Sequence, residues 1–228
     1  MRILLHCTYY PPEVGGLESH VAELARGLVE EGHRVHVVTS RSRPDLSATQ
    51  TVDGVEVVRT WFPSRTPPGW IAHALASIPA TRRLAREADV VHAQAFASIV
   101  PARVAARSAG IPLVSTLHTS HFLVRAGMRH WKPILRRLVE SADHTLAASD
   151  EIAEVGEGLR RDGGSVEALV NGVDTRRFQA AEPLWTPPPE ARPETDSDSL
   201  PDPDPGPDAP TPRVVVVPRR LFRKNGVE

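Results

Sequence analysis

Short apolar segments alternate with helical patterns through the first 180 residues of the chain. The apolar segments predict seven strands, at residues 2–7, 35–39, 55–59, 90–93, 113–117, 144–147 and 166–170. Between them, apolar residues recur at helical spacing and predict helices at residues 17–31, 70–87, 98–109, 130–141 and 151–160. Strands that alternate with helices are typical of βαβ units. We therefore predict an α/β fold with a doubly wound parallel, Rossmann-like sheet of about seven strands.

A proline-rich acidic segment interrupts this pattern at residues 181–212. Eleven of the 22 prolines lie between Pro183 and Pro212, together with seven acidic residues and a single base, Arg192. Such a segment buries too little apolar surface to offset the entropy of ordering its backbone, so we expect a disordered hinge or linker. Residues 213–217 then show a new strand pattern, and the chain ends at Glu228. We expect a folded domain at 1–180 and the truncated start of a second domain at 213–228, so that the chain is a fragment.

Charge and composition exclude several classes of protein. The net charge is −1, but without residues 183–212 the chain has 26 basic and 21 acidic residues, a net charge of +5. No apolar run reaches the roughly 20 residues of a membrane-spanning helix, and the first residues are too short a run for a secretory signal. One cysteine, Cys7, allows no internal disulfide, so we expect a cytoplasmic protein. No basic stripe with interleaved aromatic residues indicates a nucleic-acid partner.

The loop after the first predicted strand is the first candidate site. It contains Tyr9, Glu13, Gly15 and Gly16 and leads directly into a helix. Paired glycines allow a ligand to approach the backbone, and a helix N-terminus offers free N–H groups to an anion. The alternative is a turn that requires glycine at positive φ. The loop matches neither the dinucleotide-binding pattern nor a P-loop.

Three histidines end predicted strands or begin loops: His6, His92 and His118. His118 lies where a parallel strand delivers a side chain to a ligand, and a neutral imidazole there could donate to a sugar hydroxyl or a carbonyl. The alternative for each is a structural histidine with its hydrogen bonds satisfied. His118 and His121 have no nearby cysteine or carboxylate to complete a ligand set, so we expect no metal site.

Two later segments are also candidates. Asn171 and Gly172 follow the last strand of the first domain, where the pair alone predicts a turn. Arg219, Arg220, Arg223 and Lys224 follow the strand at 213–217. A basic cluster at a strand end could bind a diphosphate. The alternative interpretation is a solvent-exposed basic edge without a ligand.

Taken in order, these motifs resemble family-4 glycosyltransferases, which have two Rossmann-like domains in the B-type fold. The matching segments are residues 9–21, 32–39, 89–92, 116–118, 147–149, 170–174 with Phe178, 220–221 and 226–228. The resemblance extends over the whole chain except the proline-rich segment. It implies that residues 1–180 are the acceptor-side domain and residues 213–228 the start of the donor-binding domain.

The resemblance implies a retaining, metal-independent transfer of a sugar from a nucleotide-diphosphate donor to a glycan or lipid-linked acceptor. The nucleotide sugar is a co-substrate, and no cofactor is implied. By the resemblance, Gly15 and Gly16 contact the donor diphosphate, and Arg220 stabilises the leaving diphosphate. His118 faces the donor sugar, where it either supports charge or orients a hydroxyl near the reacting carbon. The cleft is expected to include Tyr9, Glu13, His92, Ser149 and Asn171.

One position departs from the family pattern. Asn225 stands where the family usually has lysine, and Lys224 lies one residue earlier. We expect Lys224 or Arg223 to make this phosphate contact. The family's paired glutamates and nucleotide pocket lie beyond Glu228, so we expect the isolated chain to be catalytically inert.

The acceptor and the class of protein leave alternatives open. The helical segment at 127–142, together with Arg82, Arg83 and Arg86, could rest on an anionic membrane as a peripheral contact. The alternative, which we favour, is an ordinary helix that packs its apolar side on the sheet. Instead of a transferase, the protein could be a non-catalytic binding subunit or, with less support, a sugar-nucleotide epimerase of the same architecture.

Overall fold

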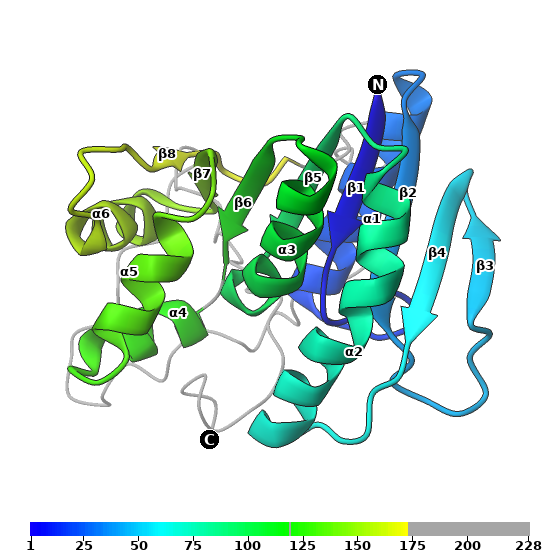
Figure 1. Ribbon diagram of the computed structural model, residues 1–228, viewed down its shortest axis with the longest axis horizontal. Helices are drawn as coiled ribbons and strands as arrows, with labels where there is room; N and C mark the ends of the chain where they lie inside the picture. Colours follow the sequence, from blue (N-terminus) through cyan, green and yellow to red (C-terminus); the bar gives the residue numbers. More distant parts are fainter. Residues whose placement is uncertain (119, 173–228) are drawn as a thin grey trace, which may run out of the picture. The chain divides into compact units, whose positions relative to one another are not determined.

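A computed structural model describes residues 1–118 and 120–172 of the chain (Figure 1). Its strands are β1 (Arg2–His6), β2 (Arg34–Ser40), β3 (Thr49–Val52), β4 (Val55–Thr60), β5 (Val90–Gln94), β6 (Leu113–Leu117), β7 (His144–Ala147) and β8 (Glu167–Ala168). Its helices are α1 (Gly16–Glu30), α2 (Pro67–Ala85), α3 (Ile99–Ala109), α4 (Ser120–Gly127), α5 (Lys132–Val139) and α6 (Asp150–Leu159), with a 3₁₀ turn, η1, at Phe96–Ser98.

The strands form one sheet in the order β3-β4-β2-β1-β5-β6-β7-β8. β3 runs antiparallel to β4, and all other pairs are parallel. β1 is the turning point: the chain first builds outward to β2 and β4 on one side, then returns to place β5 on the other. Open α/β sheets bind ligands at the carboxyl ends of the strands that flank such a point.

Helices cover both faces of the sheet, because right-handed crossovers change face when the direction of building reverses. α1 covers one face, where Val21 and Ala25 join a buried cluster with Leu5, Val37 and Val57. The later helices share the second buried cluster, which contains residues from α2, α3, α4, α5 and α6. Figure 1 shows α2 and α3 on the near side of the sheet and α1 behind it. The predicted doubly wound parallel sheet is therefore confirmed.

The sequence prediction missed the strand β3. β3 is a polar strand at the edge of the sheet, and three of its four residues are exposed. It therefore lacks the apolar pattern from which the other strands were predicted. It pairs with β4 through a two-residue turn in which Asp53 and Gly54 have φ of 50° and 76°. This Asp-Gly turn is the hairpin signal that the sequence did contain.

The helix boundaries also needed correction. α4 was not predicted, and the helix predicted at 130–141 is the shorter α5, whose second residue is Pro133. The last predicted strand, at 166–170, is reduced to the two residues of β8. The linker at 181–212, the strand at 213–217 and the basic residues that follow it lie outside the described residues.

Candidate functional site

The paired glycines lie where the loop after β1 meets α1. Gly15 is the N-cap of α1, with φ of −178°, and Gly16 is the first residue of the helix. Four described glycines have positive φ, and neither Gly15 nor Gly16 is among them. The turn that would need glycine for its backbone conformation is therefore not the explanation for this pair. Gly16 is exposed and has no atom within 4 Å of the position a Cβ would take, which leaves room for a ligand to approach its backbone.

The N-cap residue of α1, Gly15, has no side chain that could cap the helix, and a carboxylate from the first turn lies next to it. The Glu18 carboxylate folds back so closely that its Cδ would lie 2.8 Å from a Cβ on Gly15. Free N–H groups and the helix dipole favour negative charge at such a position. The anion contact at Gly15 and Gly16 stays a prediction, and the Glu18 carboxylate lies at the predicted position.

Tyr9 and Glu13 hold the same loop in place. The Tyr9 hydroxyl accepts a hydrogen bond from Trp70 Nε1 at 2.8 Å, and the Arg65 guanidinium lies 5.2 Å from the centre of its ring. Glu13 pairs with Arg65 at 2.5 Å and accepts a bond from Ser42 Oγ at 2.7 Å. The Arg65 guanidinium, as the main cause, holds the pKa of the Glu13 carboxyl below its usual range. In this structure both side chains anchor the loop to α2 and its neighbouring loops.

A chain of polar side chains crosses the carboxyl ends of β5 and β6. His118 Nε2 lies 2.8 Å from Gln94 Oε1, and both residues are buried. His92 Nε2 lies 2.7 Å from Thr116 Oγ1, on the neighbouring strand. His20 of α1 brings its ring to within 5.0 Å of the His118 ring, centre to centre. The predicted candidates His92 and His118 are thus brought together, beneath the helix that begins at Gly16.

The histidines of this site are neutral at physiological pH. Burial, followed by the proximity of His20, lowers the pKa of His118 to about 3. The same two causes lower the pKa of His92 to about 4, and burial alone lowers that of His20. Neutral imidazoles donate from one ring nitrogen and accept at the other. The site therefore offers hydrogen bonds of both kinds and no positive charge from these rings.

The backbone next to Gln94 has an unusual conformation. Ala95 has φ of 70° and ψ of 155°, and its N–H donates to the Thr116 carbonyl at 2.9 Å. Residues other than glycine in such a region cost about 1–3 kcal/mol and occur preferentially at functional sites. The strain lies at the end of β5, beside the hydrogen bond between Gln94 and His118.

The other predicted candidates either make contacts that stabilise the fold or lie away from the His118 site. His6 is buried, its Nε2 lies 3.0 Å from Ser77 Oγ, and burial lowers its pKa to about 3. Ser149 caps α6 by accepting a bond from the N–H of Ile152 at 3.3 Å. Asn171 is exposed beyond β8. Arg220 and Lys224 lie outside the described residues.

The helix considered as a membrane contact packs its apolar side inward. Leu135 and Val139 are fully buried in the core of the domain, and Trp131 and Leu138 pack against it. Ile134 of the same helix is exposed, and the membrane contact stays untested. Within residues 1–118 and 120–172, no helix is long and apolar enough to cross a membrane. The same residues contain no group of three side chains that could hold a metal ion.

Gln94 and His20 belong to the site, although sequence reasoning named neither of them as a candidate. Gln94 is fully buried at the end of β5. A polar residue at the end of an apolar strand is the sequence feature that could have identified it. His20 lies one helical turn after Gly16, so the spacing alone places it on the same side of α1. Its ring contact with His118 depends on how α1 packs on the sheet, which no local pattern specifies.

A doubly wound, mostly parallel sheet with helices on both faces defines a Rossmann-like domain. More particularly, the chain belongs to Glycosyltransferase Family 4, whose sequence model matches residues 14–177. It is 30% identical over 212 residues to the glycogen synthase of Mycobacterium tuberculosis, a match that covers 79% of this chain and 50% of that protein. It is 25% identical over 242 residues to a component of the phosphatidylinositol N-acetylglucosaminyltransferase of Arabidopsis thaliana, covering 99% of this chain and 47% of that protein.

Solved structures show the same fold. Sucrose-phosphate synthase from Thermosynechococcus elongatus superimposes with a TM-score of 0.63 at 14% identity, over 79% of this chain and 50% of that chain. The Anabaena protein Alr3699/HepE, in complex with UDP-glucose, gives a TM-score of 0.55 at 18% identity, over 80% of this chain and 47% of that chain. The chain spans about half the length of the relatives it matches.

Proposed function

We propose that this chain is the acceptor-side domain of a glycosyltransferase that moves a hexosyl group from a nucleotide-diphosphate donor to an acceptor, with retention and without a metal. The observation that carries the proposal is the placement of the exposed start of α1 near the buried pair of His118 and Gln94, with the His20 ring of α1 5.0 Å from the His118 ring. One feature suits a diphosphate, and the other suits a sugar hydroxyl. Membership of Glycosyltransferase Family 4 supports this combination.

In this proposal, His118 orients a hydroxyl of the donor sugar. The resemblance left two roles open for His118, supporting charge or orienting a hydroxyl. A pKa lowered to about 3 favours the second, because the ring carries no positive charge at neutral pH. With Nε2 bonded to Gln94 Oε1, Nδ1 is the nitrogen left for the ligand. Positive charge for the leaving diphosphate then has to come from elsewhere, and Arg220 with Lys224 remains our proposal for it.

The partners follow from the same argument. The solved relative that holds UDP-glucose supports a nucleotide sugar as donor. A glycan or a lipid-linked sugar is the proposed acceptor, and the relatives include a glycogen synthase as well as a transferase component named for phosphatidylinositol. We propose a cytoplasmic location, with any membrane contact peripheral and at the inner face. Residues 1–228 alone are proposed to be inert, since the donor-binding half of the fold is needed to complete the site.

The test is sugar transfer by the full-length protein, with a panel of nucleotide sugars and both kinds of acceptor. His118→Ala is expected to lower kcat about 100-fold or more, as loss of a positioned hydrogen-bonding group does. His121→Ala is the matched control, because His121 is exposed on the next helix and should have no effect. Transfer by purified 1–228 would contradict the proposed inertness.

Two outcomes would assign the protein to another class. Binding of a nucleotide sugar or acceptor without turnover would indicate a non-catalytic binding protein. Conversion of one nucleotide sugar into another without an acceptor would indicate an epimerase.

A further inference from the structure

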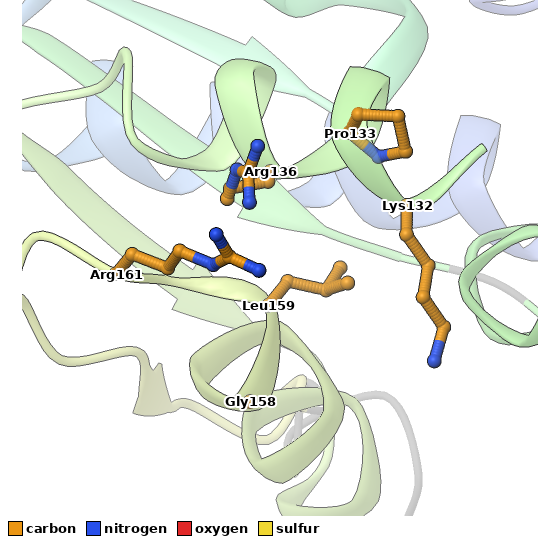
Figure 2. A pocket seen from close by; sticks show the side chains of 6 residues that line it. All are labelled: Lys132, Pro133, Arg136, Gly158, Leu159 and Arg161. Carbon is orange, nitrogen blue, oxygen red and sulfur yellow. The ribbon is translucent and has the colours of Figure 1, made fainter. Parts of the chain in front are cut away.

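Between α5 and α6 lies a hollow of about 500 Å³ that is lined by cationic side chains. Its residues are Lys132, Pro133, Arg136, Gly158, Leu159 and Arg161, shown in Figure 2. No carboxylate is among them. Figure 2 shows the Arg161 side chain extending toward Leu159, with Arg136 of α5 above it and Lys132 on the other side of the hollow.

The fold itself brings these charges together. Leu135 and Val139 of α5 face the core, which places Lys132 and Arg136, one turn apart, on the flank of the helix beside α6. Arg161 follows α6, and its backbone N–H donates to Glu140 Oε1 at 2.9 Å. That bond ties the segment after α6 to the end of α5 without using the Arg161 side chain.

The three cations have no ion-pair partner among the described residues. The neighbouring base, Arg160, pairs with Asp162 at 2.7 Å, and Glu140 is bonded to a backbone N–H. Among residues 1–118 and 120–172, the ion pairs include none made by Lys132, Arg136 or Arg161. Like charges that converge on one hollow repel each other until an anion neutralises them.

We propose that this hollow, whose lining includes no residue of α1, is a binding site for a phosphate-bearing ligand. Planar guanidinium groups bind phosphate oxygens in pairs, and a lysine ammonium adds a third donor group. The hollow is larger than one phosphate, so the ligand is a phosphate ester that carries further atoms. Either a soluble phosphorylated sugar or a lipid headgroup supplies that chemistry. The exposed Lys132 and Arg161 leave the hollow open to both.

The test uses the full chain and a readout specific to this hollow. Inorganic pyrophosphate is titrated while the Nε–Hε resonances of Arg136 and Arg161 are followed by NMR, so that binding near Gly16 does not interfere. We expect saturable shifts at both arginines. In Lys132→Gln/Arg161→Gln, the shift of Arg136 should need at least about ten times more pyrophosphate. The control Arg129→Gln/Arg137→Gln removes equal charge from exposed positions that do not line the hollow, and should bind like the wild type.

A second measurement identifies the source of the phosphate. Flotation with vesicles of phosphatidylcholine plus phosphatidic acid is compared with vesicles of phosphatidylcholine alone. Flotation that requires phosphatidic acid and is lost in Lys132→Gln/Arg161→Gln supports a lipid headgroup. Pyrophosphate binding without flotation supports a soluble ligand. The proposal is overturned if neither assay detects binding, or if the control double variant loses binding as completely as Lys132→Gln/Arg161→Gln.

Discussion

Gln94 accepts a hydrogen bond at its Oε1 from His118 Nε2, 2.8 Å away, between the ends of two neighbouring parallel strands. The same glutamine places its amide nitrogen 3.3 Å from His92 Nε2 and 3.4 Å from His92 Nδ1. Because an amide oxygen can only accept, its bond to His118 places the ring hydrogen of His118 on Nε2. Gln94 is therefore a positioning residue for His118.

Replacing Gln94 by glutamate should raise the pKa of His118. A carboxylate beside a buried imidazole stabilises its protonated form and opposes the burial that now lowers the pKa to about 3. An NMR titration of the ring protons measures this directly, and we expect His118 to titrate at least about one unit higher. Gln94→Leu is the control, since it removes the hydrogen bond without adding charge. An unchanged pKa in Gln94→Glu would contradict contact between the two side chains.

Gly16→Ala should abolish donor binding while leaving the domain folded. Nothing lies within 4 Å of the new methyl group, and Gly16 has no positive φ, so the protein should be as stable as the wild type or slightly more stable. The methyl group would instead obstruct a diphosphate at the start of α1. Isothermal titration of the full-length protein with UDP and UDP-glucose would measure the loss.

Gly27→Ala is the matched control, because Gly27 lies within the same helix and its Cβ would also meet no atom within 4 Å. It should bind nucleotide like the wild type. Unchanged nucleotide binding in Gly16→Ala would remove the first turn of α1 from the proposed donor site.

The sequence predicts those parts of the fold and the candidate site that have a local pattern, and it does not predict those that depend on tertiary packing. β1 and β2 are buried on both faces, so apolar runs reveal them. The edge strand β3 is polar and is encoded only by its turn at Asp53. The glycine pair and His118 were found because strand ends and helix starts have local signatures. Gln94 escaped because its role depends on the register between β5 and β6.

Acid should destabilise the domain well above the pH at which carboxylates protonate. His6 and His118 are buried, and the pKa of each is lowered to about 3 from an ordinary value of 6.5. A group whose pKa falls on folding contributes stability that is complete above its unfolded pKa and is lost as the pH falls toward its folded pKa. Lowering the pH from 7 to 5 should therefore reduce the free energy of unfolding by about 2 kcal/mol for each of these two histidines.

Urea denaturation at several pH values measures this effect. His118→Gln should reduce the loss between pH 7 and pH 5 by about 2 kcal/mol, the share of one buried ring. His33→Gln is the control, because His33 lies in the turn after α1, where its ring hydrogen-bonds the N-terminus at the surface. If the free energy of unfolding depended on pH identically in His118→Gln and the wild type, the pKa of His118 would be the same in the folded and the unfolded protein, which would contradict the prediction.

Gly54→Ala should destabilise the domain by about 1–3 kcal/mol through the hairpin at the edge of the sheet. Gly54 has φ of +76°, and a Cβ there would lie 2.9 Å from Val29 Cγ1 of α1, so backbone strain and a steric clash act together. Gly158→Ala is the control, because Gly158 lies exposed in α6 and its Cβ would meet nothing within 4 Å. That change should stabilise α6 slightly, since alanine favours helix over glycine by about 1 kcal/mol. The urea midpoints of the two variants should therefore shift in opposite directions from that of the wild type. Equal stability of Gly54→Ala and the wild type would exclude the left-handed turn between β3 and β4.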